Sequence, residues 1–85
     1  MDRMMPPSVR GKGFNTRELI GKSVCVIAKF GAKYCGEMVE YFERGNSVVL
    51  KDFVEYRLKG EKWDNVSKGK LIIVKGDSWG QIVQR

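Results

Sequence analysis

The sequence predicts a mainly β fold, in which a short N-terminal helix precedes about five short antiparallel strands that form a small, strongly bent barrel. Three observations predict it. From Ser23 onward apolar residues recur with the period of two that is typical of strands. The 10 glycines divide the chain into short segments. Gly36 falls inside a strand pattern, where glycine indicates a sharp bend or a bulge.

The length of 85 residues leaves room for one domain with a single core. Residues 15–85 carry the patterned sequence and form this domain. Residues 1–14 contain both prolines and show no hydrophobic period, so we expect a flexible N-terminal arm, either solvated or in contact with phosphates. The arm is basic through Arg3, Arg10 and Lys12.

The helix is expected directly after the arm. Asn15 and Glu18 have the spacing of a capping box, and Gly21 can end the helix in a left-handed conformation. The following strands are expected at residues 23–30, 34–42, 47–56, 69–76 and 79–83, with polar residues 57–68 separating the third strand from the fourth.

Residues 69–76 form the most apolar run of the chain, and such continuous apolarity predicts a strand that is buried on both faces. A small open barrel also has edges. Unpaired backbone groups on the last strands can pair with a neighbouring copy, and a domain of this size gains stability by association. The pattern therefore favours an assembly of copies.

Cys25 and Cys35 lie in the first two predicted strands. If the chain turns at residues 31–33, Phe30 faces Tyr34 and the two cysteines are not opposite one another. At about 3.3 Å per residue their sulfur atoms are then about 13 Å apart, too far for a disulfide. We therefore expect reduced thiols.

Charge and composition exclude several classes of function. Lys and Arg number 16 against 10 for Asp and Glu, and a net charge of +6 favours polyanionic partners. The chain has no His, the usual acid/base catalyst at neutral pH and the commonest metal ligand, and no Cys-x-x-Cys motif. No apolar run approaches the roughly 18 residues of a membrane span. We expect a cytoplasmic, non-enzymatic protein with no cofactor, metal or membrane partner.

Two groups of residues with defined spacing carry a family resemblance. The first contains Val24-x-Val26, Gly31, Tyr34-x-Gly36-x-Met38, the turn Phe42-Glu43-Arg44-Gly45-Asn46, and Val48-Val49-Leu50-Lys51-Asp52. The second contains Gly69, the strand Leu71-Ile72-Ile73-Val74, the turn Lys75-Gly76-Asp77, and Ile82. Together they resemble the two motifs of the Sm/LSm family, and are closest in character to archaeal Sm-like proteins. The resemblance spans residues 15–84 and implies the Sm fold.

The resemblance also implies an RNA-binding site. Asn46 matches the family's base-contacting asparagine, since its amide can pair with both a donor and an acceptor on uracil. Arg44 matches the side chain that stacks on one side of the base, and Lys75 stands where the family has an arginine on the other side. Gly76 shapes the second turn, and Asp77 either lies beside the base or caps that turn.

The chain departs from the family pattern at the first turn. Counted from Gly36, Phe42 stands where the family has aspartate; counted back from Asp52, Glu43 takes that place and Ser47 replaces Asn46. Lysine lacks the flat, forked contact of arginine, so the resemblance implies a weaker uridine preference than that of the family. Trp63 and Trp79 either stack on bases or pack in the barrel.

The resemblance implies a homo-oligomeric ring, heptameric in the family, in which the fourth strand of one copy pairs with the fifth of the next. Its pore binds single-stranded, uridine-rich RNA, for RNA processing or as an RNA chaperone, and other Sm-like chains are further ring partners. Two alternatives are a ring that serves as a protein scaffold without base readout, and a monomeric basic barrel that binds nucleic acid non-specifically. An enzyme based on either cysteine lacks a visible base.

Overall fold

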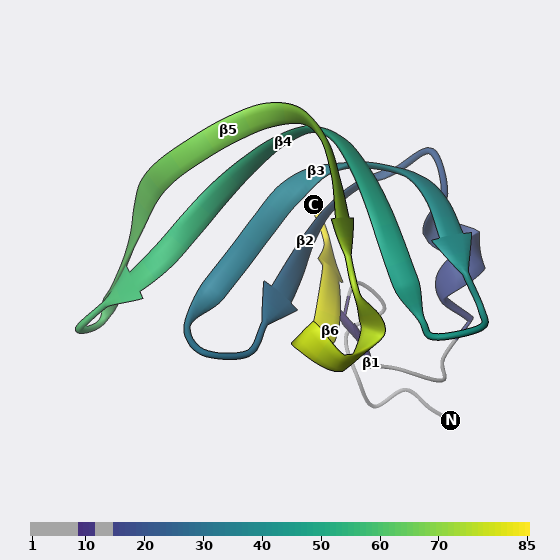
Figure 1. The fold of residues 1–85 in the computed structure, drawn as a ribbon, viewed down its shortest axis with the longest axis horizontal. Coiled ribbons are helices and arrows are strands. Elements are labelled where there is room, and N and C mark those ends of the chain that lie inside the picture. Colours follow the sequence, from purple (N-terminus) through teal and green to yellow (C-terminus); the bar gives the residue numbers. More distant parts are fainter. Residues whose placement is uncertain (1–8, 12–14) are drawn as a thin grey trace.

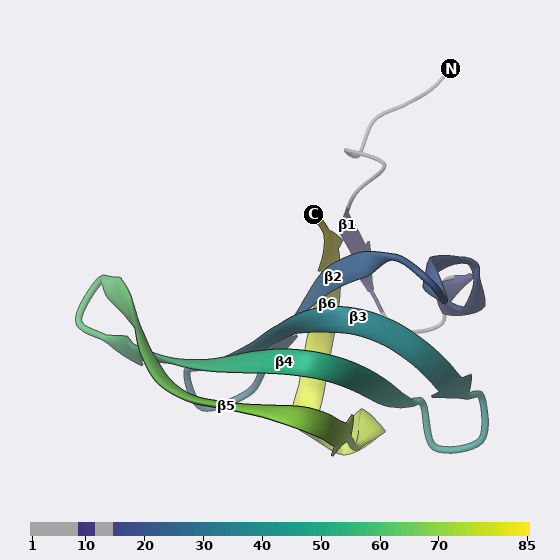
Figure 2. The ribbon, with the colours of Figure 1, turned by 90° about the horizontal axis from the view of Figure 1, so that it is seen from above.

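A computed structural model of the chain describes residues 9–11 and 15–85, whose strands form one antiparallel, six-stranded sheet (Figure 1). The elements are β1 Val9–Gly11, η1 Thr16–Leu19, β2 Ser23–Ala28, β3 Ala32–Phe42, β4 Ser47–Lys59, β5 Lys62–Val74, η2 Gly76–Ser78 and β6 Trp79–Gln84. Their order across the sheet is β1-β6-β2-β3-β4-β5. The sheet is strongly bent, and Figure 2 shows β6 crossing the direction of β4 and β5. The predicted mainly β fold is confirmed.

The predicted N-terminal helix is present as the single 3-10 turn η1. Asn15 donates its amide to the Glu18 carboxylate at 2.8 Å and makes no side-chain cap to the backbone. Gly21 takes the predicted left-handed conformation, with φ 91°, and its N–H donates to the Met38 carbonyl at 2.7 Å. The turn is thereby fastened to β3, and Leu19 enters the core.

Gly36 marks the predicted bend of β3. The pairing of β3 with β4 shifts register between Cys35 and Glu37. A Cβ atom at Gly36 would lie 2.8 Å from the Lys51 carbonyl oxygen and 3.1 Å from the Phe53 Cα atom, so β4 approaches too closely for any side chain. Only glycine fits this close approach.

The core fills the concave side of the bent sheet. Its buried side chains come from η1 and from every strand between β2 and β6, so that the bend closes around one apolar interior. They are Leu19, Val24, Val26, Met38, Tyr41, Val48, Leu50, Val74, Trp79 and Ile82.

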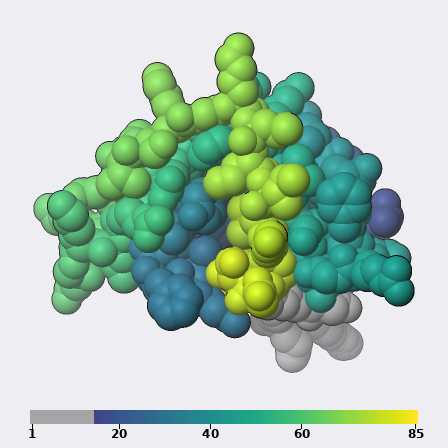
Figure 3. Space-filling view, in the orientation of Figure 1, coloured from purple at the N-terminus to yellow at the C-terminus, as the bar shows by residue number. Residues whose placement is uncertain are grey.

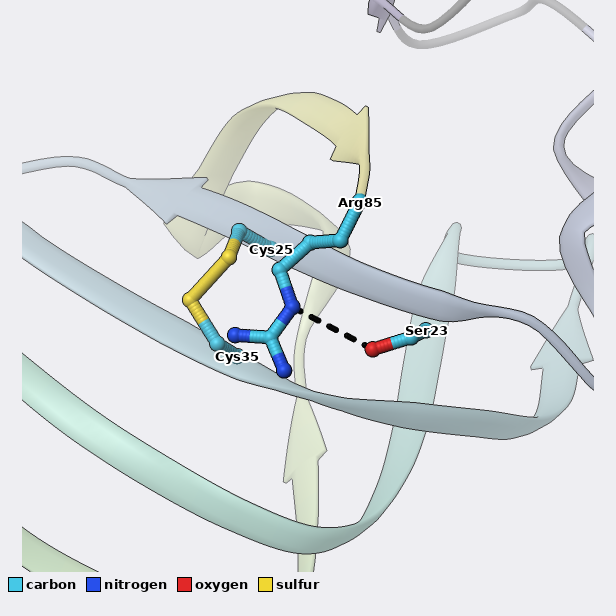
Figure 4. Close-up of a disulfide and its surroundings, with 4 residues drawn as sticks. All are labelled: Ser23, Cys25, Cys35 and Arg85. Carbon is cyan, nitrogen blue, oxygen red and sulfur yellow. Dashed lines mark hydrogen bonds between the residues drawn. A yellow bond between two sulfur atoms is a disulfide. The ribbon is translucent and has the colours of Figure 1, made fainter.

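The expectation of free thiols is wrong. β2 and β3 pair Ala28 with Ala32, which places Cys25 directly opposite Cys35 with their Cα atoms 4.0 Å apart and their sulfurs in a disulfide (Figure 4). The chain turns at residues 29–31 rather than 31–33. Phe30 and Gly31 both adopt left-handed backbone there, with φ of 63° and 71°. This earlier turn changes the register and brings the cysteines together.

The sequence suggested that the polar residues 57–68 connect two strands, but the structure places most of them within the strands. β4 continues to Lys59 and β5 begins at Lys62, so both strands extend into a hairpin that projects from the barrel (Figure 1). Leu58 and Val66 in this hairpin are exposed, and polar residues surround them. Both faces of this hairpin end are exposed to solvent, so its strands do not need alternating apolar and polar residues. The sequence therefore lacked the alternation that indicates a strand.

The prediction that residues 69–76 are buried on both faces is wrong for the single chain. Val74 enters the core, but Leu71 and Ile73 are 62% and 57% exposed. Alternate side chains of a strand point to opposite faces, so Leu71 and Ile73 lie on the face opposite that of Val74. β5 is also the last strand of the sheet, and within the described residues no further strand pairs with its outer edge.

Part of the predicted N-terminal arm is paired. Val9–Gly11 form β1 against β6, while the rest of the arm, residues 1–8 and 12–14, lies outside the described residues. Across the described chain, no helix has the length and apolar character needed to cross a membrane.

Candidate nucleic-acid interface

The first candidate turn connects β3 to β4. Phe42 pairs with Ser47 at its base, and residues 43–46 form the loop. Gly45 and Asn46 adopt left-handed backbone, with φ of 86° and 54°, which glycine and asparagine tolerate best. The Asn46 N–H closes the turn on the Glu43 carbonyl at 3.3 Å. Arg44 is exposed at the tip.

Asn46 is held by two buried aromatic residues. The Tyr41 hydroxyl donates a hydrogen bond to Asn46 Oδ1, and the Trp79 indole N–H donates to the Asn46 backbone carbonyl at 2.8 Å. Tyr41 is 5% exposed and Trp79 is fully buried. In this arrangement Nδ2 lies on the side of the amide away from Tyr41. Of the two readings of Trp79, packing in the barrel is the correct one.

The second candidate turn, at η2, touches the first. A Cβ atom on Gly76 would overlap the Gly45 carbonyl oxygen and lie 2.8 Å from Asn46 Cβ. The backbone of η2 thus packs directly on the loop that carries Asn46, and only glycine permits this approach. Asn46 and Gly76, which are distant in the chain, are therefore in direct contact.

Lys75 and Asp77 flank Gly76 and are both exposed. They line one wall of a hollow of about 550 Å³, together with Lys29, Phe30 and Arg57. The Lys29 N–H donates to the Ser78 carbonyl at 2.7 Å, which ties η2 to the β2–β3 turn. Figure 3 shows η2 and the end of β5 at the front of the molecule, open to solvent.

The basic side chains in and near the two turns differ in whether a carboxylate lies beside them. Arg57 pairs with Glu55 at 2.8 Å, and Arg17 lies 3.6 Å from Glu43. Among residues 15–85, no carboxylate lies within ion-pair distance of Arg44 or Lys75. Their charges are thus available to an anion.

The two alignments of the first turn place different residues in it. Asn46 lies in the loop and contacts Gly76, whereas Ser47 is already in β4 and pairs with Phe42. Four of the five predicted residues, Asn46, Lys75, Gly76 and Asp77, come together through the contact of the turns, and Arg44 lies two positions from Asn46. Tyr41 was missed as a site residue, because the sequence shows only an aromatic strand position.

Neither a cluster of metal ligands nor a free thiol is found in the part of the chain that the structure describes. No group of His, Cys, Asp or Glu side chains there is placed to hold a metal ion. Cys25 and Cys35 are both in the disulfide, so neither offers a thiolate.

The fold is similar to that of a Pyrococcus abyssii Sm protein, whose structure was determined in complex with a uridine heptamer. The two chains share 25% sequence identity with a TM-score of 0.68, over 81% of this chain and 90% of that one. No protein-family model and no curated protein sequence matches this chain. Motif spacing and three-dimensional structure nevertheless agree, and the chain has the Sm fold.

Proposed function

We propose that this chain binds single-stranded, uridine-rich RNA at the surface formed by Arg44, Asn46, Lys75, Gly76 and Asp77. The contact between the two turns carries the proposal, because it holds an oriented amide at a solvent-open, cationic surface. The similarity to an Sm protein that was solved with a uridine heptamer supports the choice of ligand.

Each side chain has a distinct role in this proposal. The Asn46 amide donates through Nδ2 to a uracil carbonyl and accepts the uracil N3–H through Oδ1. The Arg44 guanidinium stacks on the base, and the Lys75 ammonium attracts the phosphates without a flat contact. Gly76 keeps η2 close to Asn46, and the Asp77 carboxylate offers an acceptor to a ribose hydroxyl.

One such site holds about one base, which binds weakly, so useful affinity requires repetition. We propose a homo-oligomeric ring, with seven subunits as the family resemblance implies, that places the sites around a pore. The outer side of β5, with its exposed Leu71 and Ile73, is the surface that a neighbouring copy would cover. In this form the protein acts in RNA processing or as an RNA chaperone.

Replacing Asn46 by alanine tests the base contact. We expect Asn46→Ala to lower the ratio of uridine-heptamer to cytidine-heptamer affinity about tenfold, since a two-point base contact is worth about 1–3 kcal/mol. Fluorescence anisotropy at fixed salt measures both affinities. Asn65→Ala, on the exposed part of β5, removes an identical side chain far along the hairpin and should leave the ratio unchanged. An Asn46→Ala variant with the wild-type ratio would contradict this site, and a wild-type chain that binds neither oligomer would contradict RNA binding.

Tyr41 is expected to act by orienting Asn46. Uracil and cytosine present their donor and acceptor in opposite order, so an amide turned by 180° would suit cytosine. In the structure the Tyr41 hydroxyl donates to Oδ1, which is the arrangement that suits uracil. Tyr41→Phe keeps the buried ring, and we expect a fall of about fivefold in the uridine preference, in line with about 1 kcal/mol for one hydrogen bond.

The matched control for Tyr41→Phe is Tyr34→Phe, whose ring packs on Phe53. Loss of one hydrogen bond of about 1 kcal/mol should lower the melting temperature of Tyr41→Phe by only about 4–8 °C, and of the two variants only Tyr41→Phe should change base preference. Equal preference in all three proteins would show that Tyr41 only fills the core.

A further inference from the structure

The strand β6 is paired on both of its edges. One edge pairs with β2, from Val24 opposite Gln84 to Ala28 opposite Trp79. The other edge pairs with β1, which places Val9, Arg10 and Gly11 opposite Val83, Ile82 and Gln81. Figures 1 and 2 both show β1 beside β6. A strand has only two edges, so β6 has none left along residues 81–83.

This pairing conflicts with the proposed ring. A ring in which β5 of one copy pairs with β6 of the next needs the outer edge of β6, and β1 occupies it within the same chain. Each backbone N–H and C=O on that edge can serve one neighbouring strand. β1 and an incoming β5 are therefore mutually exclusive partners.

We propose that β1 holds the β6 edge within the free chain and leaves it when β5 of a second copy pairs there, so that Val9–Gly11 control assembly. The proposal rests on the ring described above. It identifies the outer edge of β6 as a surface with two competing occupants, one from the same chain and one from a second copy.

β1 and the β5 strand of a second copy differ in how well they can pair with the β6 edge. β1 offers 3 residues, whereas β6 has 6 and β5 has 13, so β5 can satisfy more of the edge. Pairing with β5 also covers part of the exposed Leu71 and Ile73. β1 has the advantage of being tethered, which corresponds to an effective concentration in the millimolar range for a short linker. β1 therefore occupies the β6 edge at low protein concentration, and β5 of a second copy occupies it at high protein concentration.

Weakening β1 in the full chain tests this competition. Alternate residues of an antiparallel strand turn their N–H toward the partner, so one of two adjacent prolines must remove such a donor. We expect Val9→Pro/Arg10→Pro to lower the concentration at half-assembly about tenfold, as measured by sedimentation velocity. Arg10→Gln, which removes the same charge but keeps the N–H, should assemble like the wild type.

Locking β1 provides the opposite test. Gly11 and Gln81 are directly opposite, within reach of a disulfide, so Gly11→Cys/Gln81→Cys can fasten β1 to β6. We expect the oxidised variant to stay monomeric at concentrations where the wild type assembles, and a reductant to restore assembly. Wild type with the same reductant controls for loss of the native disulfide.

The outcomes separate this proposal from the proposed function. If the locked variant assembles at the wild-type concentration, β1 does not compete for the edge and this proposal is overturned, while the ring stands. If the wild type stays monomeric at every concentration, with or without a uridine heptamer, the ring itself is overturned and this proposal with it.

Discussion

Gly76→Ala is expected to abolish uridine binding and to lower the free energy of unfolding by about 3 kcal/mol. The added methyl group would overlap the Gly45 carbonyl oxygen and press on Asn46 Cβ, so η2 and the β3–β4 turn must move apart. Overpacking at a rigid contact costs about 1–3 kcal/mol, and backbone on both sides leaves no flexible side chain to give way. Separation of the turns would also remove the surface on which the base contacts depend.

Gly80→Ala is the matched control for this variant. Gly80 lies in β6, where an added Cβ would meet nothing within 4 Å. The melting temperature of Gly76→Ala should fall by about 12–24 °C, at about 4–8 °C per kcal/mol for a domain of this size, whereas that of Gly80→Ala should stay near the wild-type value. A Gly76→Ala variant with unchanged melting temperature and uridine affinity would show that the two turns are not in contact.

Reduction of the Cys25–Cys35 disulfide is expected to have an effect of similar size. The bond closes a loop with a sequence separation of 10, and closing a loop of that length stabilises the native state by about 2.7 kcal/mol in the chain-entropy treatment. The melting temperature should therefore drop by about 10–20 °C when a phosphine reductant is present.

The control for reduction is the Cys25→Ala/Cys35→Ala variant, whose melting temperature should not respond to the reductant. A thiol titration of the denatured, unreduced wild type checks the bond directly and should find none of the two cysteines free. Two titratable thiols in that experiment would show that Cys25 and Cys35 are not joined in a disulfide.

The cysteines show which parts of the fold a single sequence leaves open. The structural roles of two glycines were predictable. Gly21 ends a turn in the left-handed conformation, and Gly36 allows two strands to approach closely. The register of β2 against β3 was not predictable. Either residues 29–31 or 31–33 can form the turn by composition, and the choice depends on Phe30 adopting a left-handed backbone that its side chain does not favour.

The apolar run of β5 shows a second kind of limit. The run predicted burial on both faces, but Leu71 and Ile73 are exposed in the single chain, and their burial would require a second copy. An apolar pattern alone does not tell whether the chain itself or a second copy covers a strand face, which is why the burial of this run could not be predicted.

The candidate site was predictable where its residues belong to turns with defined spacing. Asn46, Lys75, Gly76 and Asp77 follow from motif position, and the structure brings the two turns into contact. Tyr41 did not follow, because its role arises from a hydrogen bond across the base of the turn. Side-chain orientation of this kind depends on packing, which no local pattern encodes.

The proposed ring and its ligand can be observed together by native mass spectrometry of the wild-type chain, with and without a uridine heptamer. We expect a closed assembly of identical copies, seven by the family resemblance, that retains one uridine heptamer and releases it as the ammonium acetate concentration is raised. A single copy of 9.7 kDa at all concentrations, with no heptamer retained, would contradict it.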